Sequence, residues 1–103
     1  MCGLLAVYTK KEIKRNKFEQ VLKKIEHRGP DNTSFWNSTD KSIFLGHTRL
    51  SIIDISEDGN QPMLNETKDI VLVCNGEIYN YINLRENLIE KGHKFKSKSD
   101  SEV

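Results

Sequence analysis

The first residues that could do chemistry are Met1, Cys2 and Gly3. Removal of the initiator methionine would leave Cys2 with a thiol and a free α-amino group. An α-amine has an ordinary pKa of about 8, so a fraction of it is neutral near pH 7 and could accept the thiol proton. Cys2 would then supply both nucleophile and base, and Gly3 would let the backbone approach a substrate closely. Many chains begin with Met-Cys for no chemical reason, so this pattern alone establishes no site.

Asn75 and Gly76 follow an apolar segment, residues 70–74, which we expect to form a strand buried on both faces. A strand that ends in Asn-Gly can present a side-chain amide beside a backbone N–H, which is the donor pair that an oxyanion hole needs. A hairpin turn is the alternative, but it requires a second strand at once, and the residues from Leu84 onward have helical spacing. The pattern favours an oxyanion site. Cys74 itself is better explained as a small buried apolar residue.

Two charged side chains could each bind a ligand group of opposite charge. Arg49 lies in a half-apolar segment, where a bound carboxylate would give it a bidentate, charge-assisted pair. A salt bridge to a protein carboxylate is the alternative, which the residue pattern alone favours. Asp100 could hold a substrate ammonium, or could lie on the solvated surface. The string at residues 27–31, His-Arg-Gly-Pro-Asp, is explained well as a helix end, because basic residues offset the helix dipole and Gly-Pro breaks the helix.

Strands and two helices must position these residues. Residues 17–27 have apolar side chains at helical spacing, and Asn16 with Glu19 resembles a capping box. A second helix is expected, with a cap at residues 83–86 and a stop at Gly92. The segments with strand character are residues 3–8, 34–37, 42–45, 48–53, 70–74 and 93–97. This order predicts an α+β domain or layered sandwich, and the abrupt end at residue 103 leads us to expect a truncated one.

Composition narrows the class of protein. The 103 residues suffice for one small domain. With 36% hydrophobic residues, 30% charged residues and a formal net charge of +1, the chain has no strong field to attract nucleic acid or a membrane surface. It has no apolar run long enough to span a bilayer and no signal-peptide pattern. Two cysteines are too few for a disulfide scaffold and lack metal-ligand spacing. We therefore expect free thiols, a cytoplasmic location and no metal site.

Six short strings occur in a telling order along the chain. They are Met-Cys-Gly, His-Arg-Gly-Pro-Asp, Arg-Leu-Ser-Ile-Ile-Asp, Gly-Asn-Gln-Pro-Met, Asn-Gly-Glu-Ile-Tyr-Asn and Ser-Asp-Ser-Glu-Val. Together they resemble the N-terminal glutaminase domain of glutamine-hydrolysing asparagine synthases, which are N-terminal-nucleophile amidotransferases, and the resemblance extends over essentially the whole chain. Residues 30–31, 50–54 and 77–79 separate it from related amidotransferases that make glucosamine phosphate or phosphoribosylamine.

The resemblance implies a role for each candidate residue. Cys2 would attack the side-chain amide carbon of L-glutamine, with its own α-amine as the general base. Asn75 and the Gly76 N–H would stabilise the oxyanion, Arg49 would pair with the α-carboxylate, and Asp100 would bind the α-ammonium. A glutamyl thioester would form, ammonia would leave, and water would release glutamate. The residues implied to complete the glutamine pocket are Glu77, Leu50, Ser51, Ile52 and Ile53.

The resemblance also implies a larger protein. The family's glutaminase domain is an α-β-β-α layered sandwich about twice as long as this chain, so residues 1–103 would be part of it. The synthetase domain, which binds ATP and magnesium and converts aspartate to asparagine, has no counterpart here, so no cofactor is expected in this chain. The expected partners are glutamine and the rest of the protein, in cis or as a second chain. The alternatives are an inactive remnant that still binds glutamine, and a structural domain whose motifs are coincidental.

Overall fold

Three antiparallel strands form the larger of two sheets in the computed structural model, which describes residues 1–103. The strands are β1 (Gly3–Tyr8), β2 (Asn32–Asn37) and β3 (Ile43–Arg49), in the order β1-β3-β2. Gly3 lies opposite Thr48 in the register of β1 with β3, and Asn32 lies opposite Arg49 in that of β2 with β3. The first residues of β1 and β2 therefore lie beside the last residues of β3.

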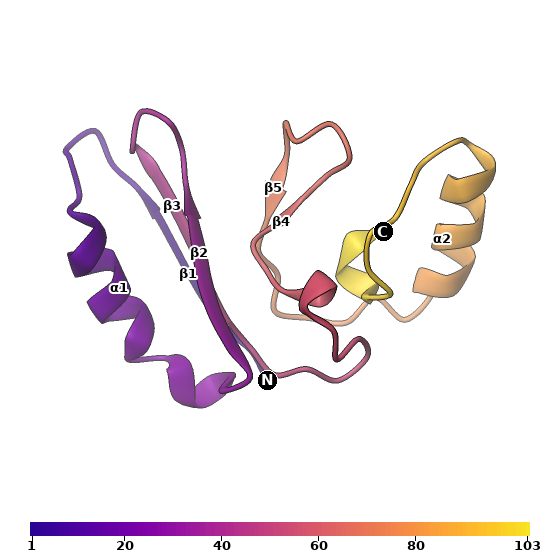
Figure 1. The fold of residues 1–103 in the computed structure, drawn as a ribbon, viewed down its shortest axis with the longest axis horizontal. Helices are drawn as coiled ribbons and strands as arrows, with labels where there is room; N and C mark the ends of the chain where they lie inside the picture. The colour runs from indigo at the N-terminus through magenta and orange to yellow at the C-terminus, as the bar shows by residue number, and fades with distance from the viewer.

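Helix α1 (Arg15–Lys23) covers one face of this sheet (Figure 1). The core consists of Phe18, Leu22 and Phe44, which are at most 3% exposed. Alternate residues of a strand share a face, so Gly46 faces the helix as Phe44 does. A Cβ on Gly46 would lie 2.8 Å from a methyl carbon of Leu22, and its absence lets the helix pack directly on the strand. A short 3₁₀ helix, η1 (Glu26–Arg28), follows and returns the chain to the sheet.

The second half of the chain builds a smaller sheet and a second helix. It contains η2 (Glu57–Gly59), β4 (Met63–Leu64), β5 (Val71–Leu72), α2 (Tyr81–Glu90) and η3 (Asp100–Glu102). Strands β4 and β5 pair antiparallel. Across Figure 1 the order is α1, the large sheet, the small sheet and α2. The fold is thus α+β with antiparallel sheets, and no helix in it has the length and apolar character needed to cross a membrane.

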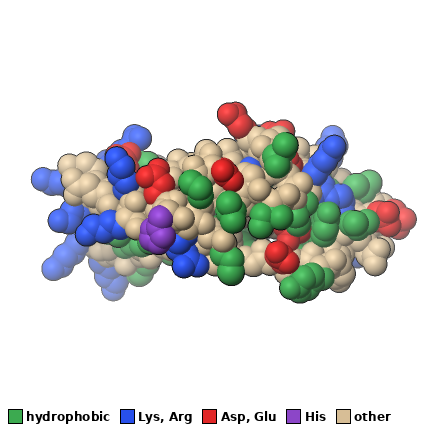
Figure 2. Space-filling view, turned by 90° about the horizontal axis from the view of Figure 1, so that it is seen from below, with side chains coloured by type: hydrophobic (Ala, Val, Ile, Leu, Met, Phe, Trp, Pro, Cys, Tyr) green, Lys and Arg blue, Asp and Glu red, His purple; other side chains and the backbone are tan.

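Apolar side chains remain exposed on both sheets. On the large sheet they include Leu4, Tyr8 and Ile43, and near the small sheet they include Leu64, Ile70 and Leu72. Only four of the 17 buried residues are hydrophobic side chains of the core. Figure 2 shows how the surface is divided: Lys and Arg side chains gather at the end where α1 lies, and hydrophobic side chains reach the surface over the other half. Apolar faces of this kind are surfaces that another segment or chain usually covers.

Several expected elements differ from the structure. The strand expected at residues 70–74 pairs only over Val71–Leu72, and Leu72 is 41% exposed, so the prediction of burial on both faces is wrong here. The separate strand at residues 48–53 is also wrong, because Thr48 and Arg49 end β3 and the chain then turns into a loop. No strand forms at residues 93–97, where the backbone is tied by side-chain bonds instead.

Both expected helices form, but their caps were predicted incorrectly, and α1 ends at Lys23 and not at residue 27, because residues 26–28 form η1. Helix α1 begins after Lys14 with no side-chain cap bond, so Asn16 and Glu19 form no capping box. Helix α2 begins after Asn80, before the cap expected at residues 83–86. Its expected stop is confirmed, since Gly92 adopts φ +96°, a conformation that glycine reaches without steric cost. Gly3 approaches Thr48 Oγ1 and Ile25 on the α1 side, so the expected close approach to a substrate is not what this glycine provides.

Candidate active site

Cys2 is placed by the pairing of β1 with β3. Gly3 N donates a 3.1 Å hydrogen bond to Thr48 Oγ1, and Thr48 Oγ1 donates to Ile25 O at 3.1 Å. These bonds fix the start of β1 and bring the Cys2 thiol against the Leu50 peptide. Leu50 N donates to Cys2 Sγ at 3.3 Å, and Leu50 O lies 3.7 Å from the sulfur. Arg28 Nε also donates to Cys2 O at 3.2 Å. The nucleophile predicted at the chain start is therefore held at the end of the central strand.

Arg49, the last residue of β3, is only 6% exposed and makes no ion pair. Its guanidinium donates to Ser56 O at 2.6 Å, to Asn60 Oδ1 at 2.9 Å and to Asp54 O. Gly59 lies against the guanidinium, where a Cβ would collide with it. An arginine has five N–H donors, and here two of them, one on Nε and one on Nη2, have no protein acceptor. The salt-bridge alternative is thus not what the structure contains.

Asp54 joins the Arg49 loop to the segment that carries Asp100. Its Oδ1 accepts from Ser56 N at 2.9 Å and from Ser56 Oγ at 2.6 Å, and its Oδ2 accepts from Lys98 N at 2.7 Å. The bond from the Ser56 hydroxyl, followed by that from Lys98 N, lowers the pKa of Asp54 to about 2. Hydrogen bonds to a carboxylate stabilise its charged form, so Asp54 is an anion that ties two loops together.

Asp100 lies in η3 and is 6% exposed. Its Oδ2 accepts from Ile78 N at 2.7 Å, and its other carboxylate oxygen accepts no hydrogen bond from the protein. Arg85 of α2 fixes the same segment by donating to Ser97 O at 2.8 Å and to Ser99 O at 2.9 Å. Asp100 is therefore not a solvated surface acid. It is a buried carboxylate with one oxygen available to a ligand.

Asn75 and Gly76 follow β5 after two unpaired residues. The Cys74 peptide just before them is bonded on both sides: Cys74 N donates to Gln61 Oε1 at 2.6 Å, and Cys74 O lies 3.2 Å from His47 Nε2. Asn75 and Gly76 are exposed to solvent and line the same cavity as Cys2. No second strand follows them, since the chain continues into α2, so the hairpin alternative is excluded.

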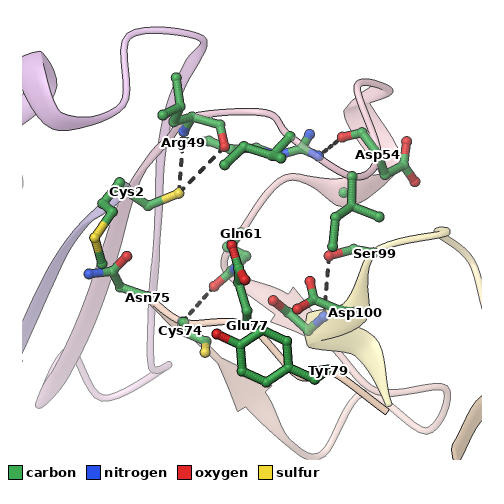
Figure 3. A pocket seen from close by; sticks show the side chains of 17 residues that line it. Cys2, Arg49, Asp54, Gln61, Cys74, Asn75, Glu77, Tyr79, Ser99 and Asp100 are labelled. Carbon is green, nitrogen blue, oxygen red and sulfur yellow. Dashed lines mark hydrogen bonds between the residues drawn. The ribbon is translucent and has the colours of Figure 1, made fainter. Parts of the chain in front are cut away.

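These elements enclose a cavity of about 400 Å³, within the range of small-molecule sites. Figure 3 shows Cys2 and Asn75 on one side of it and Ser99 and Asp100 on the other, with Arg49 between them. The residues that line it are Met1, Cys2, Arg49, Leu50, Ile52, Ile53, Asp54, Gly59, Gln61, Cys74, Asn75, Gly76, Glu77, Tyr79, Ser99, Asp100 and Ser101. The cavity thus combines a thiol, amide and N–H donors, a guanidinium and a carboxylate.

The structure brings nearly all the expected site residues together. Ser51 is the one that lies elsewhere: its N–H donates to Asp31 Oδ2 at 2.8 Å, and it lines a neighbouring hollow. Sequence reasoning missed Asp54 and Gln61. Both lie inside the strings that carried the family resemblance, Arg-Leu-Ser-Ile-Ile-Asp and Gly-Asn-Gln-Pro-Met, so those strings held the signal. It missed Arg85 as well, for which no such string exists.

Comparison with known proteins adds independent findings. The chain matches the glutamine amidotransferase domain family over residues 1–103. It is 42% identical over 108 aligned residues to "Asparagine synthetase [glutamine-hydrolyzing] 1" of Bacillus subtilis, and 42% identical over 106 to the protein of the same name in Arabidopsis thaliana. A Dictyostelium discoideum protein named as a probable asparagine synthetase is 43% identical. The match covers all of this chain but only 17% of the Bacillus and Arabidopsis proteins.

Proposed function

We propose, from the finding that this chain belongs to the glutamine amidotransferase family, that it hydrolyses the side-chain amide of glutamine. The observation that carries the proposal is that the buried guanidinium of Arg49 has no carboxylate partner. A buried guanidinium with no carboxylate partner costs free energy. Here two of its N–H donors have no protein acceptor, and Arg49 lines a cavity that Cys2 also lines. A substrate carboxylate would supply the missing acceptor.

Asp100 supports an α-amino acid as the substrate. Asp100 has one carboxylate oxygen without a protein donor and lines the same cavity as Arg49, so an ammonium and a carboxylate on one carbon could be bound at once. The acceptor of one group and the donors of the other are both held by the protein before any ligand binds. Glu77, Leu50, Ile52 and Ile53 would then surround the bound glutamine, and Ser51 would contribute through its backbone.

Cys2 would carry the chemistry after removal of Met1. The α-amine takes the thiol proton, and the sulfur bonds to the amide carbon, giving a tetrahedral oxyanion. The Asn75 amide and the Gly76 N–H stabilise that charge. The proton passes to the amide nitrogen, ammonia leaves and a thioester remains. Water then attacks the thioester, and glutamate and the free thiol are released.

The layered α-β-β-α sandwich is part of the same proposal. The order of α1, the two sheets and α2 across the molecule supports it, as do the apolar side chains exposed on the two sheets, because a face-to-face sandwich would cover them. We further propose that residues 1–103 act within a longer protein whose synthetase domain holds ATP and magnesium and uses the ammonia to make asparagine from aspartate. A reducing compartment such as the cytoplasm would keep the Cys2 thiol free.

A labelling experiment tests the assignment of Cys2. The thiol-reactive glutamine analogue 6-diazo-5-oxonorleucine should label Cys2 in the full-length protein and leave Cys74 unmodified. Glutamate release should require both Cys2 and loss of Met1, as measured with Cys2→Ala and by intact mass. Labelling at Cys74, or activity in protein that retains Met1, would contradict this mechanism. Glutamine binding without release would instead favour the alternative of a non-catalytic binding domain.

A further inference from the structure

The Cys74 peptide lies beyond the end of β5, where strand pairing no longer supports it. Two side chains replace that pairing. Gln61 Oε1 accepts from Cys74 N at 2.6 Å, and His47 Nε2 lies 3.2 Å from Cys74 O. His47 is 0% exposed and Gln61 is 6% exposed. Buried hydrogen bonds to a peptide restrict its orientation, and the peptide held here is the one directly before Asn75.

Both side chains are anchored on the large sheet. His47 belongs to the central strand β3, two residues before Arg49. Gln61 is held through its own carbonyl, which accepts from Ser34 Oγ of β2 at 2.5 Å. Cys2 is also attached to this sheet through the start of β1. Asn75, by contrast, follows β5 of the small sheet. The position of Asn75 relative to Cys2 therefore depends on contacts that cross between the two sheets, and the His47 and Gln61 bonds are such contacts.

The protonation of His47 follows from its surroundings. A carbonyl oxygen can only accept, so the 3.2 Å contact with Cys74 O requires a proton on Nε2. His47 Nδ1 is buried and has no partner, so a proton there would be left unpaired. Burial is the largest cause that lowers the pKa of His47. The ring is thus neutral, with Nε2–H as the donor. His47 does not line the cavity, so it cannot act on the substrate directly.

We propose that His47 and Gln61 are positioning residues for the oxyanion site: they hold the Cys74 peptide and thereby place the Asn75 amide and the Gly76 N–H beside Cys2. This inference rests on the proposed glutaminase function and assigns two further residues to it. We call the His47 and Gln61 bonds to the Cys74 peptide the clamp. Since oxyanion donors act only in the transition state, loss of a clamp bond should slow thioester formation and leave glutamine binding nearly unchanged.

The test compares His47→Leu with His47→Gln in the full-length protein. Leucine removes the donor, whereas the glutamine side-chain nitrogen can occupy roughly the position of His47 Nε2. His47→Leu should lower kcat by about 100-fold, as expected for a misplacement on the order of 1 Å, and change the glutamine KM by less than about threefold. His47→Gln should recover most of the activity. A raised KM with intact kcat, or equal loss in both variants, would overturn the proposal.

A double-mutant comparison separates positioning from a general effect on stability. If His47 acts through Asn75, His47→Leu should lower kcat little further when Asn75→Ala is already present. A merely structural role predicts the full additional loss, and that result would refute the clamp. Gln61→Met should behave as His47→Leu does, because it removes the acceptor of the Cys74 N–H and keeps the side-chain length.

Nitrogen NMR on wild-type protein with ¹⁵N-labelled histidine needs no variant and so remains decisive if His47→Leu fails to fold. His47 should show a protonated Nε2 and an unprotonated Nδ1 at about neutral pH. An Nδ1–H ring would contradict the clamp. The proposed glutaminase function has its own test, independent of the clamp. It would be refuted if wild type released no glutamate, or if Cys2→Ala still released it. In that case the NMR result still decides whether the Cys74 peptide is held as inferred.

Discussion

Replacing Arg49 with lysine should weaken glutamine binding and leave turnover nearly intact. The guanidinium donates three hydrogen bonds, to Asp54 O, Ser56 O and Asn60 Oδ1, and its other two N–H donors have no protein acceptor. Lysine keeps the positive charge but offers a single ammonium on a flexible stem, so it cannot bond the loop and bind a carboxylate through two parallel bonds.

The magnitude follows from the bonds lost. One hydrogen bond to a charged group contributes about 1.5–3 kcal/mol, and about 1.4 kcal/mol corresponds to a tenfold change in affinity. Loss of one of the two carboxylate bonds should therefore raise the glutamine KM by roughly 10- to 150-fold. The α-carboxylate is remote from the reacting amide and is bound alike in ground and transition states, so kcat should change by less than about threefold.

The assay compares two substrates. Steady-state glutamate release is measured for wild type and Arg49→Lys, below the melting temperature of both. The matched control is Arg15→Lys, which changes an exposed arginine that pairs with Glu19 on α1 and lies over the Phe35 ring. 4-Aminobutanamide, an amide without the α-carboxylate, is then hydrolysed by both proteins. On this substrate the kcat/KM of wild type should exceed that of Arg49→Lys by much less than it does on glutamine, because the carboxylate that Arg49 would bind is absent.

Two outcomes would refute the reasoning. If Arg49→Lys lowered kcat and left KM unchanged, Arg49 would serve the transition state and not the carboxylate. If the variant lost as much on 4-aminobutanamide as on glutamine, the effect would come from the loosened loop at residues 54–60, because that substrate has no carboxylate to lose. A KM effect confined to glutamine is the expected result.

Three further predictions concern the oxyanion site, acid stability and the isolated chain. Asn75→Ala should lower kcat by about 100-fold or more, the usual cost of one oxyanion donor, with little change in KM; a pure KM effect would show that the role is wrong. The pKa of Asp54 is held at about 2, below its ordinary 3.8, so its stabilisation is complete above about pH 4 and is lost as the pH falls toward 2. Thermal melts from pH 5 to pH 2 should therefore show less acid sensitivity in Asp54→Asn than in wild type. The control is Asp40→Asn, which removes another carboxylate with a pKa of about 2 in a remote turn. This control should also alter acid sensitivity, but it should leave the glutamine KM unchanged. The 103-residue chain expressed alone should bind a hydrophobic dye and show no glutaminase activity above Cys2→Ala, because apolar side chains on both sheets lie open; a cooperative melt with Cys2-dependent activity would contradict this.

Local sequence patterns predicted the helices better than the strands. The spacing of Phe18 and Leu22 marks the face of α1 that packs on the sheet, and Gly92 marks the end of α2. These features depend on residues within one or two turns of each other. Strand pairing depends on distant partners, which explains why residues 93–97 were wrongly expected to form a strand and why β4, only two residues long, was not expected at all.

The sequence by itself determined which chemical groups are present and the family to which they belong. The strings containing Cys2, Arg49, Asn75 and Asp100 were enough for the resemblance, which the match over residues 1–103 confirms. The residue types also limit the chemistry, because a thiol, a guanidinium and an Asn-Gly pair can do only certain things.

Only the tertiary structure decided what each group contacts. Whether Arg49 pairs with a protein carboxylate, whether Asp100 is buried, and what holds the Cys74 peptide depend on segments more than twenty residues apart in several cases, such as His47 and Cys74 or Asp54 and Lys98. No periodicity encodes such contacts, because they arise when β1 and β3 pair and the loops after them fold over the strand ends. The free donors of Arg49 and the buried ring of His47 became visible only there.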